Sequence, residues 1–291
     1  MPFADLFSHW FSYSIIGALC FGVSMALYKW PAHDKAIDTN ALNTWRNIVQ
    51  LLLACLFFYG SFTFVLGDTI LIAFLRGGLF TALTLLQMYA LTKVETNTLY
   101  PITSTFSLLV VIVVGISFFH DAISMLQLLG MLLAVVAIYC FSYRSGKWKW
   151  GKKESYIGIA IVVFSAISNI VHKLAADMGD IYNFQIWLYV FIFATGLIPL
   201  FIQHKKETFG KMWHRKSFLA GVAIAIFSFL GAYALLVALT KGPLSLVQTT
   251  NSAYLFVAVP FAAFLFKESL TAKKVLLILL AFVAIAIIRL G

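Results

Sequence analysis

The chain has 291 residues, of which 62% are hydrophobic and only 11% are charged, and its mean hydropathy is +0.95. A soluble globular domain carries about 25% charged residues, so this composition excludes a water-soluble protein and favours one that is embedded in a membrane. The net charge of +10 does not indicate nucleic-acid binding, because the basic residues lie in short breaks between apolar runs.

Ten apolar runs follow one another, each close to the length of about 20 residues that a spanning helix needs. They cover residues 13–30, 42–60, 69–92, 97–119, 123–143, 155–175, 182–203, 217–240, 244–266 and 271–290. The first run is expected to be a permanent anchor, since MPFADLFSHW has no basic n-region and no small-residue cleavage signal. Runs such as LLVVIVVGISFF lack the polar face that a soluble helix shows. We therefore predict an all-α integral membrane protein with ten transmembrane helices.

The tetrapeptide Ala-Leu-Thr-Lys occurs twice, at 90–93 and 238–241, directly before the fourth and the ninth runs. The segments that follow the two copies align, and the first run (SYSIIGALCFGVSMALYK) is similar to the sixth (SYIGIAIVVFSAISNIVHK). We infer a five-helix unit written twice, as residues 1–145 and 146–291. Five is odd, so the second unit must enter the membrane in the opposite orientation. Inverted repeats of this kind are typical of secondary transporters, whose substrate site lies between the halves near the midplane.

Charge distribution predicts the orientation. Of the 21 Lys and Arg residues, 17, including Arg46, fall in the odd-numbered loops or at the adjoining helix ends. The other face has four, which are Arg76, Lys173, Lys241 and Arg289. The positive-inside rule then places the odd-numbered loops in the cytoplasm and both termini outside.

Two turns carry a family resemblance. FFHDAIS (118–124) and FKESLT (266–271) resemble the LGERLS/T turn of the drug/metabolite transporter superfamily, EamA branch. In each, an acidic residue, Asp121 or Glu268, precedes an apolar residue and a Ser or Thr that can cap the next helix. The ALTK segments resemble the family's AL-x-Y-T-S/A segment, whereas Phe119 and Lys267 replace the glycine of its turn. The resemblance implies a ten-helix EamA-like transporter in the bacterial inner (plasma) membrane. It also implies cytoplasmic termini, opposite to the orientation that the charges predict.

A polar group inside a membrane is costly unless it faces protein or a water-filled cavity. The resemblance implies that helices 1, 3, 4, 6, 8 and 9 line the central cavity, and their polar residues are the candidate substrate contacts. These are Tyr28, Arg76, Gln87, Tyr100, Thr103, Ser168, Asn169, His172, Tyr233, Gln248, Asn251 and Tyr254. The alternative for the amides is a bond between helices, and the alternative for Arg76 is extension toward the headgroups. The repeat also pairs Thr103 with Asn251 and Phe106 with Tyr254 across the cavity.

All eleven Asp and Glu residues lie in loops or at helix ends. A permanent organic cation would therefore find no countercharge within the membrane. We predict a secondary transporter that moves a small neutral, zwitterionic or anionic metabolite by alternating access, and multidrug or organic-cation efflux is the alternative.

A membrane-embedded enzyme or a channel is a remote alternative. An enzyme would need a nucleophile–base pair or a metal cluster at depth. The sequence shows no His/Asp/Glu cluster, and its three cysteines have no metal spacing. We expect no metal and no cofactor. The expected partners are the lipid bilayer and a small-molecule substrate, with the protein as a monomer or a homodimer.

The charge bias can be tested by cysteine labelling in intact cells. A Cys introduced at Gly146 is expected to be protected from an impermeant thiol reagent, and one near the N-terminus is expected to be labelled. The opposite labelling pattern would reverse the orientation and leave the ten-helix prediction unaffected.

Overall fold

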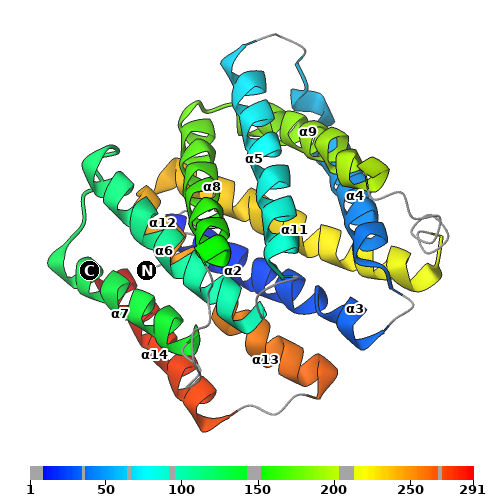
Figure 1. The fold of residues 1–291 in the computed structure, drawn as a ribbon. Coiled ribbons are helices and arrows are strands. Elements are labelled where there is room, and N and C mark those ends of the chain that lie inside the picture. Colours follow the sequence, from blue (N-terminus) through cyan, green and yellow to red (C-terminus); the bar gives the residue numbers. More distant parts are fainter. Residues whose placement is uncertain are drawn as a thin grey trace.

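The computed structural model describes residues 9–34, 37–63, 67–91, 96–142, 152–202, 213–267 and 271–291, and apart from turns they are helical (Figure 1). The helices are α2 (Trp10–Leu27), α3 (Trp30–His33), α4 (Thr39–Phe58), η1 (Tyr59–Ser61), α5 (Asp68–Leu91), α6 (Thr96–Ser117), α7 (Met125–Ser142), α8 (Lys152–Asp177), α9 (Ile181–Ile202), α11 (Arg215–Lys241), α12 (Leu244–Asn251), α13 (Tyr254–Phe266) and α14 (Ala272–Leu290). Helix occupies each of the ten predicted runs, which confirms the all-α fold.

Several of these helices are long enough to cross a bilayer. Within the described residues, seven segments are both long and apolar enough: Trp10–Leu27, Thr39–Ser61, Asp68–Gln87, Ser155–Asp177, Ile181–Ile198, Arg215–Lys241 and Leu244–Phe266. Thr103–Ser117 and Met125–Phe141 are shorter apolar segments. The outer surface is strongly apolar, with Leu56, Leu276 and Phe264 exposed by 76%, 66% and 81%. Such a surface requires lipid rather than water around it.

Helix α4 begins earlier than the apolar run from residue 42 predicts. The Asp38 carboxylate accepts hydrogen bonds from the backbone N–H groups of Asn40 and Ala41, both at 3.0 Å, and so caps the helix. The charge count places Arg46 at a helix end, and this is wrong. Arg46 lies seven residues after Thr39, which is about 10 Å along a helix that rises 1.5 Å per residue.

The ninth predicted run consists of two helices, α12 and α13, separated by Ser252 and Ala253. The Ala253 N–H donates to the Thr250 carbonyl at 3.2 Å, and the Ser252 hydroxyl donates to the Thr249 carbonyl at 2.5 Å. These short-range bonds tighten the last turn of α12 and compete with the regular helical pattern. The regular α-helical pattern is therefore interrupted within the span.

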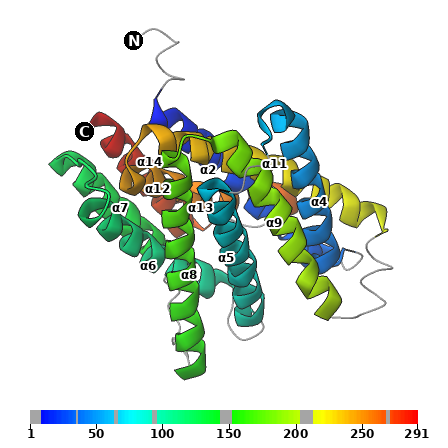
Figure 2. The same cartoon turned by 90° about the horizontal axis from the view of Figure 1, so that it is seen from above.

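The helices pack in a reciprocal pattern. α2 and α11 lie along each other in the centre, and α7 and α14 form a pair at one edge (Figures 1 and 2). The contacts of α2 with α11, of α4 with α11 and of α2 with α13 have counterparts in those of α8 with α5, of α9 with α5 and of α8 with α6. Exchanging the first five spans for the second five converts one set into the other. This pattern supports our proposal of two units, 1–145 and 146–291, although their junction lies outside the described residues, as does Gly146.

The contact between α7 and α14 depends on a glycine. A Cβ atom at Gly130 would lie 2.9 Å from the Ala284 carbonyl oxygen and 3.0 Å from the Ile288 backbone nitrogen. Backbone atoms cannot rotate away as a side chain can, so the two helices could keep this distance only without a side chain at residue 130. Small residues commonly allow such close packing between membrane helices.

Gly130→Ala is expected to lower the melting temperature of the detergent-solubilised protein, because overpacking typically costs about 1–3 kcal/mol. Gly78→Ala is the matched control. It also lies within a helix, but its Cβ would meet no atom within 4 Å. There the change should be neutral or stabilising, by about 0.5–1 kcal/mol from helix propensity. Equal shifts in the two variants would contradict the close-packing argument.

Candidate functional site

Arg46 lies in a small polar pocket between α4, α5 and α9. The cavity has a volume of about 40 Å³, and Arg46 is the one charged residue in its lining. Its polar neighbours are Asn40, Asn43, Thr44, Asn47, Thr81 and Thr84. Those from α4 recur at intervals of three and four, so they follow one face of the helix from its first turn inward.

The Arg46 guanidinium is held by neutral partners. Its Nε and Nη2 atoms both donate to Asn47 Oδ1, at 3.1 and 2.7 Å, and Nη1 donates to the Tyr28 hydroxyl. Its carbon atom lies 5.3 Å from the centre of the Phe80 ring. Arg46 is only 7% exposed, and no carboxylate among the described residues pairs with it. A buried charge without a countercharge is unusual and often marks a functional site.

A second buried guanidinium, that of Arg76 on α5, lies against α8. Its Nη1 atom donates to the hydroxyl of Ser168 on α8, while its Nε atom is buried and has no hydrogen-bond partner. One turn further along α8, His172 is 2% exposed, and neither ring nitrogen has a partner. The structure thus brings together Arg76, Ser168 and His172, three of the predicted site residues.

Helix α9 contributes buried polar residues near both arginines. Tyr189 is 2% exposed and lies within electrostatic range of both Arg46 and Arg76. One turn earlier on the same helix, Gln185 is fully buried, and both polar atoms of its amide lack a partner. A row of polar groups therefore extends from the α4 pocket to α8, through a helix on which the sequence predicted no site residue.

The broken ninth span gathers another group of predicted residues. Gln248 Nε2, Thr250 Oγ1 and Asn251 Oδ1 are buried without a hydrogen-bond partner. Asn251 faces α2 at Gly17, where an added Cβ would lie 3.1 Å from its Oδ1 atom. The Tyr254 side chain lies close to that of Ser104 on α6. Buried polar atoms usually have partners, so three without a partner in about one turn mark this region as a candidate site.

The remaining predicted site residues lie outside these two groups of buried polar atoms. The Tyr28 hydroxyl donates to Asn43, which lines the Arg46 pocket, and Thr103 donates to the backbone of its own helix at Leu99. Tyr233 is in an aromatic cluster with Phe58 and Tyr182. Gln87 and Asn169 are half-buried on α5 and α8, and the Tyr100 side chain lies outside the described part of the chain.

The expected pairing of Phe106 with Tyr254 across a cavity is wrong. Phe106 is 47% exposed, in line with the exposed side chains of Val110 and Val113 on the outer face of α6. Spacings of four and three place these residues on one helix face, which points to lipid. The repeat alignment gives the correct helix for Phe106 but not the direction of its side chain.

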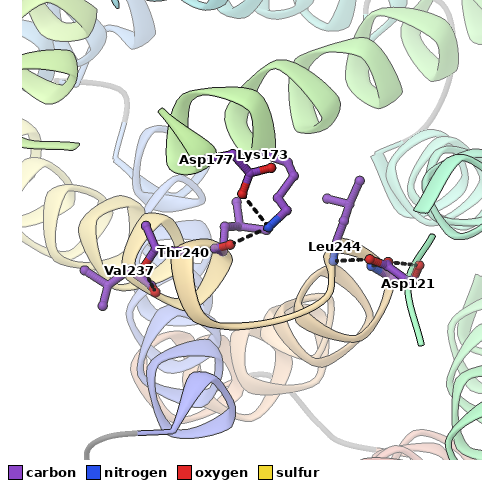
Figure 3. Close-up of polar contacts among 8 residues, drawn as sticks. Asp121, Lys173, Asp177, Val237, Thr240 and Leu244 are labelled. Carbon is purple, nitrogen blue, oxygen red and sulfur yellow. Dashed lines mark hydrogen bonds and ion pairs between the residues drawn. The ribbon is translucent and has the colours of Figure 1, made fainter. Parts of the chain in front are cut away.

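A separate open hollow of about 380 Å³ lies where α6, α8 and α11 end, and its lining includes Asp121, Lys173, Asp177 and Lys241. Lys173 Nζ pairs with Asp177 at 2.7 Å and donates to the Leu239 carbonyl at 2.8 Å (Figure 3). Lys241 Nζ lies 4.7 Å from the centre of the Tyr13 ring. These cations are engaged with protein groups at the rim of the membrane.

Asp121 caps the start of the ninth span. Its carboxylate accepts from the backbone N–H groups of Leu244 and Ser245 at 3.3 and 2.8 Å, and from the Ser245 hydroxyl at 2.6 Å (Figure 3). Negative charge at a helix N-terminus is stabilising. In the same turn, the Ser124 hydroxyl accepts from the Gln127 N–H at 3.1 Å, which confirms the predicted cap of the next helix. Glu268, the counterpart of Asp121, lies outside the described residues.

Asp121→Asn is expected to destabilise the protein by about 1–2 kcal/mol, because an amide cannot accept all three bonds. Asp177→Asn is the matched control in the same hollow. Its side chain is 45% exposed and pairs with one lysine, so its loss should cost less than about 1 kcal/mol. Thermal unfolding in detergent measures both, and a larger loss in Asp177→Asn would contradict the capping role.

Sequence reasoning missed Arg46, Asn47, Gln185 and Tyr189. The apolar run from residue 42 excluded the first turn of α4, and Arg46 was therefore counted as a loop-end charge. The signal that could have found it is the polar spacing Asn40, Asn43, Asn47, which continues into the apolar part of the helix.

Comparisons with known proteins agree with the helical architecture. Residues 153–290, from α8 to α14, match the EamA-like transporter family. No curated protein matches the chain. One solved crystal structure aligns with a TM-score of 0.73 at 12% sequence identity, over 96% of this chain and 98% of its own. At this identity the likeness shows the fold alone. Residues 153–290 are therefore similar to an EamA-like transporter domain of the drug/metabolite transporter superfamily, and the chain as a whole has the helices of a multi-pass membrane protein.

Proposed function

We propose that the protein is a secondary transporter that moves a small neutral, zwitterionic or anionic metabolite by alternating access. The observation that carries the proposal is the set of buried polar atoms without partners on α8, α9 and α12, which includes both ring nitrogens of His172, the Gln185 amide and Asn251 Oδ1. Leaving such atoms unpaired in an apolar medium is costly. A polar solute or water that passes between the helices would satisfy them.

The arrangement of the helices supports alternating access. The reciprocal contacts of the two five-helix units provide two equivalent ways to close around a central site. The 40 Å³ pocket at Arg46 is far smaller than the roughly 300–1,000 Å³ of a pocket that encloses a whole small-molecule ligand. A metabolite would therefore require the helices to separate, as expected of a carrier with an occluded state.

Charge distinguishes the proposal from organic-cation efflux. Within the described residues, Arg46 and Arg76 lie inside spans, while the acidic residues Asp34, Asp38, Asp68, Asp121, Glu154, Asp177 and Asp180 lie at helix ends or in loops. A quaternary ammonium ion at depth would meet positive charge without a compensating carboxylate. Desolvating such a cation is unfavourable.

The charge count of the loops supports an orientation with both termini outside.

The test combines a binding screen with uptake. Purified protein would be screened by thermal shift against neutral, zwitterionic, anionic and quaternary ammonium compounds, and stabilising compounds tested for uptake into proteoliposomes. A ligand at 100 times its dissociation constant adds about 2.7 kcal/mol of stability. We expect stabilisation and uptake from the first three classes only. Proton-dependent transport of quaternary ammonium compounds, with drug resistance in cells that express the protein, would establish the alternative.

A further inference from the structure

We propose that the pocket around Arg46 is an oxyanion-binding site, which takes the carboxylate or phosphate group of the transported metabolite. The inference rests on the transport function proposed above and narrows its substrate to compounds that carry such a group. It assigns the recognition to Arg46 and Asn47, which no sequence motif singled out.

The first argument is charge. Only 7% of the Arg46 surface is exposed, and the pocket that it lines contains no acidic residue among the described residues. Its guanidinium carbon lies 5.9 and 5.3 Å from the centres of the Tyr28 and Phe80 rings, so its nearest aromatic neighbours are also uncharged. The uncompensated positive charge is lowest in free energy when an anion lies beside it.

The second argument is the number of open donors. A guanidinium group has five N–H donors and no acceptor. Arg46 makes three hydrogen bonds, two to Asn47 and one to Tyr28, so two N–H groups, one on Nη1 and one on Nη2, have no partner among the described residues. Arginine recognises planar carboxylates and phosphates through two parallel N–H groups of this kind.

The third argument is the orientation that Arg46 imposes on its neighbours. Because the guanidinium only donates, it must face the oxygen of the Asn47 amide, and the Nδ2 amino group therefore points away from it. Asn43 Oδ1 likewise accepts from the Tyr28 hydroxyl, at 3.4 Å, which leaves its amino group as a donor. Both asparagines line the pocket. The pocket thus offers N–H groups around a fixed positive charge, which suits an oxyanion and disfavours a cation.

Gly196 of α9 makes room for this arrangement. A Cβ atom there would lie 2.4 Å from Asn47 Nδ2, a distance that real Cβ contacts do not show. Any larger residue at position 196 would displace the amide that Arg46 orients. The absence of a side chain on α9 is therefore a requirement of the Asn47 position.

The probes are inorganic phosphate and acetate, with acetamide as the uncharged counterpart of acetate. The full-length protein, purified in a non-ionic detergent without added lipid, would be titrated at constant ionic strength while its melting temperature is followed. We expect phosphate and acetate to raise the melting temperature and acetamide to leave it unchanged. Because no phospholipid is added, a shift reports the free anion rather than a lipid headgroup.

Arg46→Gln is expected to weaken the apparent affinity for both anions at least tenfold. Arg289→Gln is the matched control, since it removes the same charge from α14, where Arg289 lies over the Phe11 ring and outside the pocket. It should keep the wild-type response. Gly196→Ala leaves Arg46 in place and displaces Asn47, and it should also weaken the response, so the test does not depend on the folding of one variant.

Three outcomes would overturn the inference: no response to either anion in the wild type, an equal response in Arg46→Gln, or an equal response to acetamide. The uptake screen separates this failure from failure of the transport function. Uptake of a neutral solute that is unchanged in Arg46→Gln would leave the transporter standing and remove the oxyanion site. Loss of all uptake with an intact anion response would do the reverse.

Discussion

The rest of the structure depends on the burial of positive charge in a medium that does not solvate ions. Transfer of an unpaired ion from water into an apolar interior is among the largest penalties that a protein can incur. Arg46 reduces this penalty with one amide oxygen, one phenol and two aromatic faces, all of them neutral. Neutral partners disperse the charge without cancelling it. The helices around this group are therefore organised to keep a positive potential rather than to remove it.

This constraint explains where the polar residues lie. On α4 they form one row that leads from the first turn to the pocket, while large apolar side chains such as Leu52 and Leu56 are exposed on the same helix. Tyr189 on α9 and Ser168 on α8 continue the row to Arg76. Polar groups at depth thus occur as neighbours of one another, since a solitary one would face hydrocarbon.

Sequence reasoning predicted the architecture well, because hydrophobic length is a property of the chain itself. The number of runs and the Ser124 cap both depend on residues close together in sequence. It failed where the answer depends on a neighbour from another helix. The depth of Arg46 follows from the Asp38 cap, and its partner Asn47 fits only because α9 has glycine at residue 196.

The predicted site was correct in part for the same reason. Arg76, Ser168 and His172 could be grouped because polar residues are rare in spans, and the structure places them together. Phe106 could not be oriented, because an aromatic ring is equally acceptable to lipid and to a cavity wall. The repeat relates positions along the helices, whereas side-chain direction depends on packing that the two copies do not share.

The Asp121 cap has a mechanical consequence. Three hydrogen bonds tie the first turn of α12 to the turn between α6 and α7, so these parts behave as one rigid piece. Further along, the ninth span is interrupted at Ser252–Ala253, where shorter-range bonds join the regular pattern, and at Pro260, which has no N–H group to donate. Bending of this span is therefore expected beyond its fixed first turn, in the part that leads to α13 and its contact with α2.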